Sequence, residues 1–325
     1  MFKVRKINPK AMSEINTGFG VNSSDYGGRF LRKNGKPNIQ IKGIRSIERI
    51  SWYHILLDMP RWKFLLTIVL FYLFVNLLFA AIYYLLGLQE FGGSQTSSHF
   101  RQFMEAFFFS SQSFTVGGYG RADAGHLLIN SICAFEAFLG LLSLAVVTGL
   151  LYGRFSRPKA YLRFSENAIL APFHDQKAIM LRLAPFKNTT LTDAEAKLTL
   201  GLIVEENGKV VNKFYQLPLE YNSVNSLTLS WTIVHPITET SPFYNFTRED
   251  FQNAKGEILV YIKAFDDMFS NTVVSRTSYM LSELVIGAKF NPMYHKSEHD
   301  NKTLLHLNKL NSFNLIDMDF DENVN

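Results

Sequence analysis

Two long apolar runs divide the chain into a basic N-terminal arm, a central loop and a polar C-terminal half. The first run, Phe64–Leu86, carries no charged residue, and its one polar amide is Asn76. The second, Leu127–Tyr152, is interrupted by a single carboxylate, Glu136. At a rise of about 1.5 Å per residue, either run exceeds the roughly 30 Å of a bilayer's hydrocarbon core. The pattern predicts two transmembrane helices, since runs of this length are unusual for buried helices of a soluble protein.

A third, shorter run lies between the two predicted spans. Phe100–Ser113 is rich in aromatic residues, and its only charged residues are Arg101 and Glu105. It is too short to cross a bilayer, which takes about 20 residues in a helix. A helix that dips into the membrane must be surrounded by protein, because its broken backbone cannot face lipid. The pattern predicts such a re-entrant helix, preceded by a polar external loop.

An amphipathic stretch comes directly before the first span. Ile47–Leu57 places apolar residues at helical spacing and charged residues on its other faces. This pattern predicts a helix in the membrane interface, which Pro60 ends because proline cannot continue the helical ladder. Arg61, Trp62 and Lys63 follow it and form an expected interfacial anchor, with two cations at the depth of lipid phosphates.

The pattern changes to short alternating runs after Tyr161. Asn207-Gly208 is a hairpin signal, and a short helix is expected from Thr247, its N-cap, to about Ala254. Beyond about Phe313 the chain is acidic and polar, which predicts a disordered tail. Five runs read as strands of an immunoglobulin-like β-sandwich: Ala178–Leu183, Lys197–Val204, Leu227–His235, Ile258–Phe265 and Thr272–Arg276.

The distribution of charge sets the expected orientation. Basic residues flank the outer ends of the two spans, while the loop between the spans holds few. The positive-inside rule then places both termini in the cytoplasm, with the spans in the plasma membrane. The net charge of +5 favours anionic lipid as a partner, because no nucleic-acid motif accompanies it. The basic residues that flank the spans are Arg45, Arg49, Arg61 and Lys63 before the first, and Arg154, Arg157 and Lys159 after the second.

A glycine-rich turn follows the re-entrant run, in the sequence Thr115-Val116-Gly117-Gly118-Tyr119-Gly120. Potassium filters point successive backbone carbonyls at the ion, and glycine adopts the required backbone conformations at low cost. The run FFFSSQSFTVGGYG resembles the pore helix and selectivity filter of a potassium channel. Together with the flanking spans, it resembles the inward-rectifier potassium channel family, in particular its prokaryotic branch.

The turn departs from the family's Thr-Val-Gly-Tyr-Gly pattern. Without a gap, Val116 takes the threonine position and Gly117 the valine position; the other alignment makes one glycine an insertion. The ungapped alignment is preferred because the spacing from FFFS to GYG matches the family. Val116 then lacks the hydroxyl of the lowest ion site, and Gly117 removes a side chain behind the filter. Weaker ion discrimination or lower conductance is expected, and a collapsed filter is an alternative.

The resemblance extends over residues 28–290. Gly27–Gly43 resembles the arm that the family places against its cytoplasmic domain, and Ile47–Leu57 its slide helix. The sequence Arg154-Phe155-Ser156-Arg157-Pro158-Lys159 resembles its Arg-Phe-x-Arg-Pro linker. Arg61, Trp62, Lys63, Arg154, Arg157 and Lys159 are therefore candidate lipid-binding residues, although a plain positive-inside anchor would explain the same charges. The segments Ser230–Ile237, Ser241–Tyr244 and Phe269–Arg276 resemble family segments, the last of them its G-loop constriction.

Four residues of the second span are candidates for the cavity and the gate. The Glu136 carboxylate either faces a wet cavity, where it concentrates cations, or is satisfied locally by Gln112 or Ser113. Gly140 suits a hinge or close helix packing. Leu144 and Tyr152 lie about two turns apart and match positions where inner helices approach each other, so they are candidate hydrophobic constrictions. Ordinary helix packing is the alternative for both.

The sequence thus predicts a homotetrameric, K⁺-conducting membrane channel with a cytoplasmic β-sandwich. No catalytic set emerges, so an enzyme is not expected; no cofactor is expected either, with K⁺ as the permeant ion. The rivals are a poorly selective or silent channel and a non-conducting membrane-anchored sensor. The expected divisions are an arm over residues 1–46, a slide helix over 47–59, a pore domain over 60–155, the β-sandwich over 156–312 and the tail over 313–325.

Overall fold

The computed structural model divides the chain into two compact units. One unit is helical, Lys42–Arg157, and the other combines Met1–Ile41 with Pro158–Asn325. Each unit is described by itself. The described residues are 7–14, 17–18, 29–43, 45, 51–87, 98–117, 127–187, 189–206, 209–297 and 301–318.

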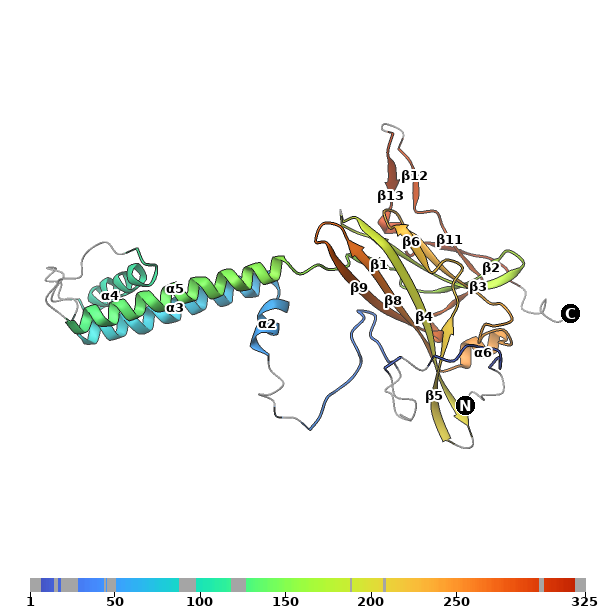
Figure 1. Cartoon of the computed structure of the whole chain (residues 1–325), viewed down its shortest axis with the longest axis horizontal. Helices are drawn as coiled ribbons and strands as arrows, with labels where there is room; N and C mark the ends of the chain where they lie inside the picture. The colour runs from blue at the N-terminus through green and yellow to red at the C-terminus, as the bar shows by residue number, and fades with distance from the viewer. Residues whose placement is uncertain are drawn as a thin grey trace. The chain divides into compact units, whose positions relative to one another are not determined.

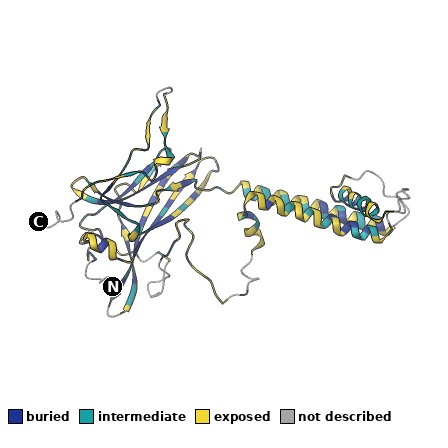
Figure 2. Cartoon of the chain, turned by 180° about the vertical axis from the view of Figure 1, so that it is seen from behind, coloured by how far each residue is buried: buried dark blue, intermediate teal, exposed yellow. Residues whose placement is uncertain are grey.

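The helical unit contains the two expected long helices, α3 (Arg61–Leu85) and α5 (Leu127–Phe155). Both are long and apolar enough to cross a membrane. They lie side by side, and most of their positions are exposed or half-buried within one chain (Figures 1 and 2). The short helix α2 (Trp52–Asp58) precedes α3, and Pro60 separates the two. The part of the predicted slide helix before Ser51 lies outside the described residues.

The third helix of this unit, α4 (His99–Phe114), is amphipathic and packs against both long helices. Its buried Ala106 joins a cluster with side chains from α3 and α5, among them Tyr83 and Ile129. The Tyr83 ring meets the Phe109 ring edge-on, with their centroids 5.1 Å apart. α4 therefore coincides with the run predicted to be too short to span a bilayer.

The second unit is built on two five-stranded sheets. In the first, β3 pairs with β1, β2 and β7, all antiparallel, and β10 pairs parallel with β2. In the second, the order β5-β4-β8-β9 is antiparallel throughout, and β6 also pairs with β4. The first sheet comprises β1 (Leu162–Phe164), β2 (Ile169–Phe173), β3 (Gln176–Pro185), β7 (Trp231–Pro236) and β10 (Val285–Ile286). The second comprises β4 (Leu191–Glu206), β5 (Lys209–Leu217), β6 (Ser223–Ser226), β8 (Gly256–Asp266) and β9 (Asn271–Met280).

Alternating apolar residues of the two sheets share one core. Leu198, Leu200 and Leu202 of β4 belong to the same buried cluster as Ile179 and Leu181 of β3. A period of two places every second side chain on one face of a strand, so the pattern that predicted these strands also supplies the core. The buried positions follow the strands of both sheets (Figure 2).

Smaller elements complete this unit. The capping box of α6 (Arg248–Asn253), formed by Thr247 and Asp250, confirms the predicted helix start. The prediction of disorder from Phe313 is wrong for its first residues, because β14 (Phe313–Leu315) pairs with β11 (Ala288–Phe290). The expected Leu227–His235 strand begins only at Trp231. The predicted turn at Asn207-Gly208 lies outside the described residues. The remaining elements are β12 (Tyr294–Lys296), β13 (Thr303–Leu305), η3 (Leu281–Glu283) and η4 (Leu307–Lys309).

The N-terminal arm is held on the second sheet by a buried carboxylate. Glu257 accepts the backbone N–H groups of Phe30 and Leu31, and Arg29 forms an ion pair of 3.2 Å with Glu283. Burial acts to raise the pKa of Glu283, but the Met280 N–H and the nearby Arg29 outweigh it and hold that pKa below its usual value. The arm makes a tight turn around Asn34-Gly35, with a β-bridge between Leu31 and Pro37.

His235 is a structural residue of the β unit. Its Nδ1–H donates to the Pro218 carbonyl at 2.6 Å, and its Nε2 accepts from Ser241 Oγ at 2.8 Å. Burial lowers the pKa of His235 to about 4, although the bond to Pro218 opposes the shift. The ring is therefore neutral at pH 7, and its partners are those of a satisfied buried histidine rather than a catalytic base.

Candidate pore site

The end of α4 has the hydrogen bonds of a Schellman cap. The N–H of Gly117 donates to the Gln112 carbonyl at 2.9 Å, and the N–H of Val116 donates to the Ser113 carbonyl at 3.0 Å. This pairing satisfies the last carbonyls of the helix and turns the chain sharply. The predicted filter thus begins directly at the end of a helix that packs against α3 and α5. Its later members Gly118, Tyr119 and Gly120 lie outside the described residues.

The capping position is occupied by an unfavourable residue type. Val116 has φ of 57°, in the left-handed region that glycine usually fills. A β-branched side chain there costs roughly 1–2 kcal/mol. Thr115, one step earlier, bonds back to the helix through Oγ1 and the Ser111 carbonyl at 2.8 Å. The first filter positions therefore combine a strained valine with a flexible glycine at 117.

Glu136 lies in a closed polar cluster where α3, α4 and α5 meet. Its carboxylate accepts from Tyr83 Oη of α3 at 2.7 Å and from Ser110 Oγ of α4 at 2.5 Å. All three side chains are fully buried within one chain. Ser110 Oγ also lies 3.2 Å from Oδ1 of the buried Asn76. The carboxylate thus joins the inner helix both to the outer helix and to the helix that leads into the filter.

This arrangement favours local satisfaction of Glu136 over exposure to a cavity. The partners differ from the two suggested by sequence: Gln112 is exposed, and Ser113 accepts from Cys133 Sγ at 3.3 Å. Sequence reasoning missed Tyr83 and Ser110. The sequence does show hydroxyl groups on α3 and α4, and polar groups inside a membrane commonly form hydrogen bonds between helices. Such hydroxyls could have been considered as partners of Glu136.

Gly140 allows α5 to approach the end of α4. A Cβ added at this position would collide with the backbone carbonyl of Phe114. This close approach favours helix packing over a hinge as the role of Gly140, next to the start of the predicted filter. Leu144 and Tyr152 of the same helix are 64% and 74% exposed within one chain, so their side chains are available to other copies.

The candidate lipid-binding residues fall into two groups. Arg61, Trp62 and Lys63 begin α3 and are exposed, as is Lys159 in the other unit. Arg154 is instead bound internally: Nη1 donates to the Leu56 carbonyl and Nη2 to the Met59 carbonyl, both at 2.6 Å.

The internal contacts of Arg154 and Arg157 join α5 to α2. The Arg154 guanidinium lies 4.5 Å from the centroid of the Phe64 ring, and the carbonyls that it binds close the C-terminal end of α2. Arg157 pairs with Asp58 at 3.3 Å. Arg154 therefore joins α5 to the C-terminal end of α2, and its donors are directed to carbonyls rather than to lipid.

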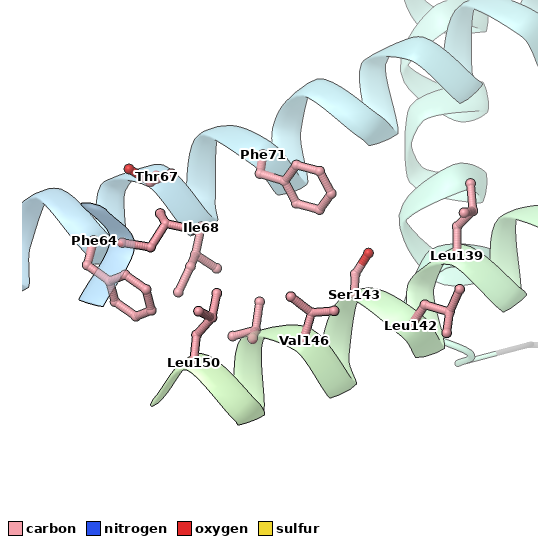
Figure 3. A pocket seen from close by; sticks show the side chains of 11 residues that line it. Phe64, Thr67, Ile68, Phe71, Leu139, Leu142, Ser143, Val146 and Leu150 are labelled. Carbon is pink, nitrogen blue, oxygen red and sulfur yellow. The ribbon is translucent and has the colours of Figure 1, made fainter. Parts of the chain in front are cut away.

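An apolar groove of about 350 Å³ runs between α3 and α5. Phe64, Ile68 and Phe71 face it from α3, and Val146 and Leu150 face it from α5 (Figure 3). Its lining is almost entirely apolar, with Thr67 and Ser143 as the polar exceptions. Such a surface suits an environment of lipid chains or other helices, in agreement with the two predicted spans.

Comparison with known proteins gives a consistent result. Residues 162–320 match the family model described as inward rectifier potassium channel C-terminal domain. The inward rectifier potassium channel Kirbac3.1 of Paramagnetospirillum magnetotacticum is 33% identical over 81% of this chain and 88% of its own length. The G protein-activated inward rectifier potassium channel 2 of Pongo abelii is 24% identical over 82% of this chain and 67% of its own. The G protein-activated inward rectifier potassium channel 4 of Mus musculus is also 24% identical, over 82% of this chain and 68% of its own length.

Proposed function

Because the chain belongs to the inward rectifier potassium channel family, we propose that it assembles into a homotetramer that conducts K⁺ across the plasma membrane. The observation that carries this proposal is the end of α4, where a helix packed between two apolar helices delivers the chain into the Gly-Gly-Tyr-Gly turn. Two spans enclose no pore, so several copies must surround one axis. The family resemblance sets the number of copies at four. Both termini of each copy would lie in the cytoplasm, as the basic residues that flank the spans indicate.

Gating is proposed at two constrictions. The exposed Leu144 and Tyr152 would meet their copies around the axis and close the inner helices by dewetting. The second constriction is the Phe269–Arg276 segment at the tip of the β8–β9 hairpin, where Ser270 has φ of 46°. Anionic lipid would act on the exposed cations at the start of α3, and Arg154 would transmit the movement of α2 to α5.

Ion flux tests the proposal. Purified protein in liposomes is expected to take up radiolabelled Rb⁺ in preference to Na⁺, and Ba²⁺ is expected to block that uptake. Equal uptake of both ions would replace the proposal by the poorly selective channel that strain at Val116 and flexibility at Gly117 favour. If no lipid composition gives uptake, conduction is refuted, and a silent channel or a sensor remains.

The two groups of basic residues are expected to respond differently to lipid. Replacing Arg61 and Lys63 by glutamine should shift the anionic-lipid fraction that gives half-maximal flux, since each cation contributes about 1 kcal/mol near an anionic surface. Two cations together correspond to roughly a 30-fold weaker apparent affinity. Arg154→Lys should instead lower the maximal flux without moving the midpoint, because a lysine cannot reproduce the forked bonds to Leu56 and Met59.

Flux measured against phosphatidylglycerol fraction distinguishes these effects. A matched single substitution of the exposed Lys159 calibrates the effect of removing one charge. A midpoint shift for Arg154→Lys as large as that for the double variant would contradict the coupling role and return Arg154 to the lipid site.

A further inference from the structure

Two histidines lie together on the hairpin formed by β12 and β13, which projects from the β unit (Figure 1). His295 is paired with Leu304, and His306 follows two residues after Leu304. His306 is the residue after the end of β13 at Leu305, and its ring stacks on that of His295. Neither belongs to the predicted pore, the gates or the lipid-binding residues.

The separation of the two rings matches that of a chelating pair. The Nε2 atoms are 3.4 Å apart, and the ring centroids are 4.5 Å apart. Two nitrogens bound to one tetrahedral ion at about 2.0–2.1 Å are separated by about 3.3 Å. The ring planes differ by 12°, so the two lone pairs lie in nearly parallel planes, and one ring must turn before both lone pairs can reach the same ion. Rotation of one ring about its Cβ–Cγ bond would point both Nε2 lone pairs at one ion. This torsion has a broad energy well, so the rotation costs little.

The base of the hairpin holds this pair in place. Met293 and Leu310 are buried against Ala184, and the His306 N–H donates to the Met293 carbonyl at 2.7 Å. The two imidazoles themselves remain accessible, since His295 is exposed and His306 half-buried. Backbone fixed on the protein side and ring nitrogens open to solvent are what an ion needs to enter and be held by two ligands.

We propose that His295 and His306 form a bidentate site for a divalent transition-metal ion of the Zn²⁺, Ni²⁺ or Cu²⁺ class. Imidazole suits these ions, whereas Ca²⁺ and Mg²⁺ require oxygen ligands. Within the described ranges no third His, Cys, Asp or Glu joins the pair, so water fills the remaining positions. The bound ion would cross-link the two strands of the hairpin.

Zinc titration of the tag-free, full-length protein in detergent tests the proposal. Calorimetry is expected to find a site in the wild type that His295→Gln and His306→Gln each weaken at least about tenfold, because a chelate depends on both ligands. His174→Gln is the matched control: His174 is also an exposed histidine of the β unit, and its loss should leave this site unchanged. Unaltered affinity and stoichiometry in either single variant of the pair would overturn the proposal.

A second measurement guards against variants that merely disturb the hairpin. With Cu²⁺ as the probe, electron paramagnetic resonance of the wild type should show superhyperfine coupling to two equivalent nitrogens. Each single variant should show one. A one-nitrogen spectrum in the wild type would mean that the rings only stack, and the chelate would be refuted.

Discussion

Replacing Glu136 by alanine is expected to abolish Rb⁺ flux and to lower the thermal stability of the detergent-solubilised protein. The substitution removes the Glu136 acceptor from both Tyr83 and Ser110; Ser110 keeps Asn76 Oδ1 at 3.2 Å as a second acceptor, whereas the buried Tyr83 hydroxyl loses its bond. Buried polar groups that lose their partner typically cost about 1–3 kcal/mol each, and interhelical bonds in membranes fall at the low end of that range. A destabilisation of roughly 1–2 kcal/mol per subunit is expected, and it acts at α4, the helix that leads into the predicted filter.

Glu136→Gln separates the two roles proposed for this residue. Glutamine keeps the shape of the side chain and accepts at least one of the two bonds, so the variant should keep its thermal stability and a flux close to that of the wild type. If the carboxylate instead served as a cation-concentrating charge, the glutamine variant would keep its stability but lose flux. If the alanine variant unfolds at the same temperature as the wild type, the bonds of Glu136 to Tyr83 and Ser110 do not hold the helices in position.

The large features of this chain follow from local pattern. Length and the lack of charge identify α3 and α5, and alternation identifies the strands around β4 and β8, because one periodicity determines both the element and its buried face. The helix before α3 could also be predicted from its amphipathic pattern, although the structure describes only its Trp52–Asp58 part. The end of the β unit is harder to predict: Phe313–Leu315 adjoins an acidic, polar stretch, and the sequence does not show that β11 offers an edge for it to pair with.

The site depends on contacts between distant segments, which a pattern does not contain. Glu136 could be singled out as a carboxylate in an apolar run, but its partners, Tyr83 and Ser110, lie on two other helices. Arg154 looked like the other juxtamembrane cations until its donors were found on the carbonyls that end α2. Charge alone does not distinguish a residue that binds lipid from one that caps a helix. The two are distinguished by where the donor groups of the side chain point.

Val116→Thr combined with Gly117→Val is expected to raise the ratio of Rb⁺ to Na⁺ uptake. In the ungapped alignment, threonine restores the hydroxyl of the lowest ion site and valine restores the side chain behind the filter. An ion–hydroxyl contact of about 1 kcal/mol, comparable to a hydrogen bond, corresponds to a roughly fivefold change in selectivity. Parallel liposome uptake of the two ions provides the measurement.

Val116→Gly separates the hydroxyl from the backbone strain. Threonine and valine are both β-branched, so the single variant Val116→Thr keeps the strain of the left-handed position and adds only the hydroxyl. Glycine relieves the strain and adds no ligand. Selectivity that rises with threonine but not with glycine would locate the defect in the missing hydroxyl and support the ungapped alignment. A rise with glycine alone would locate it in the strained cap of α4, and no change in any of the variants would contradict the assignment of Val116 to the threonine position.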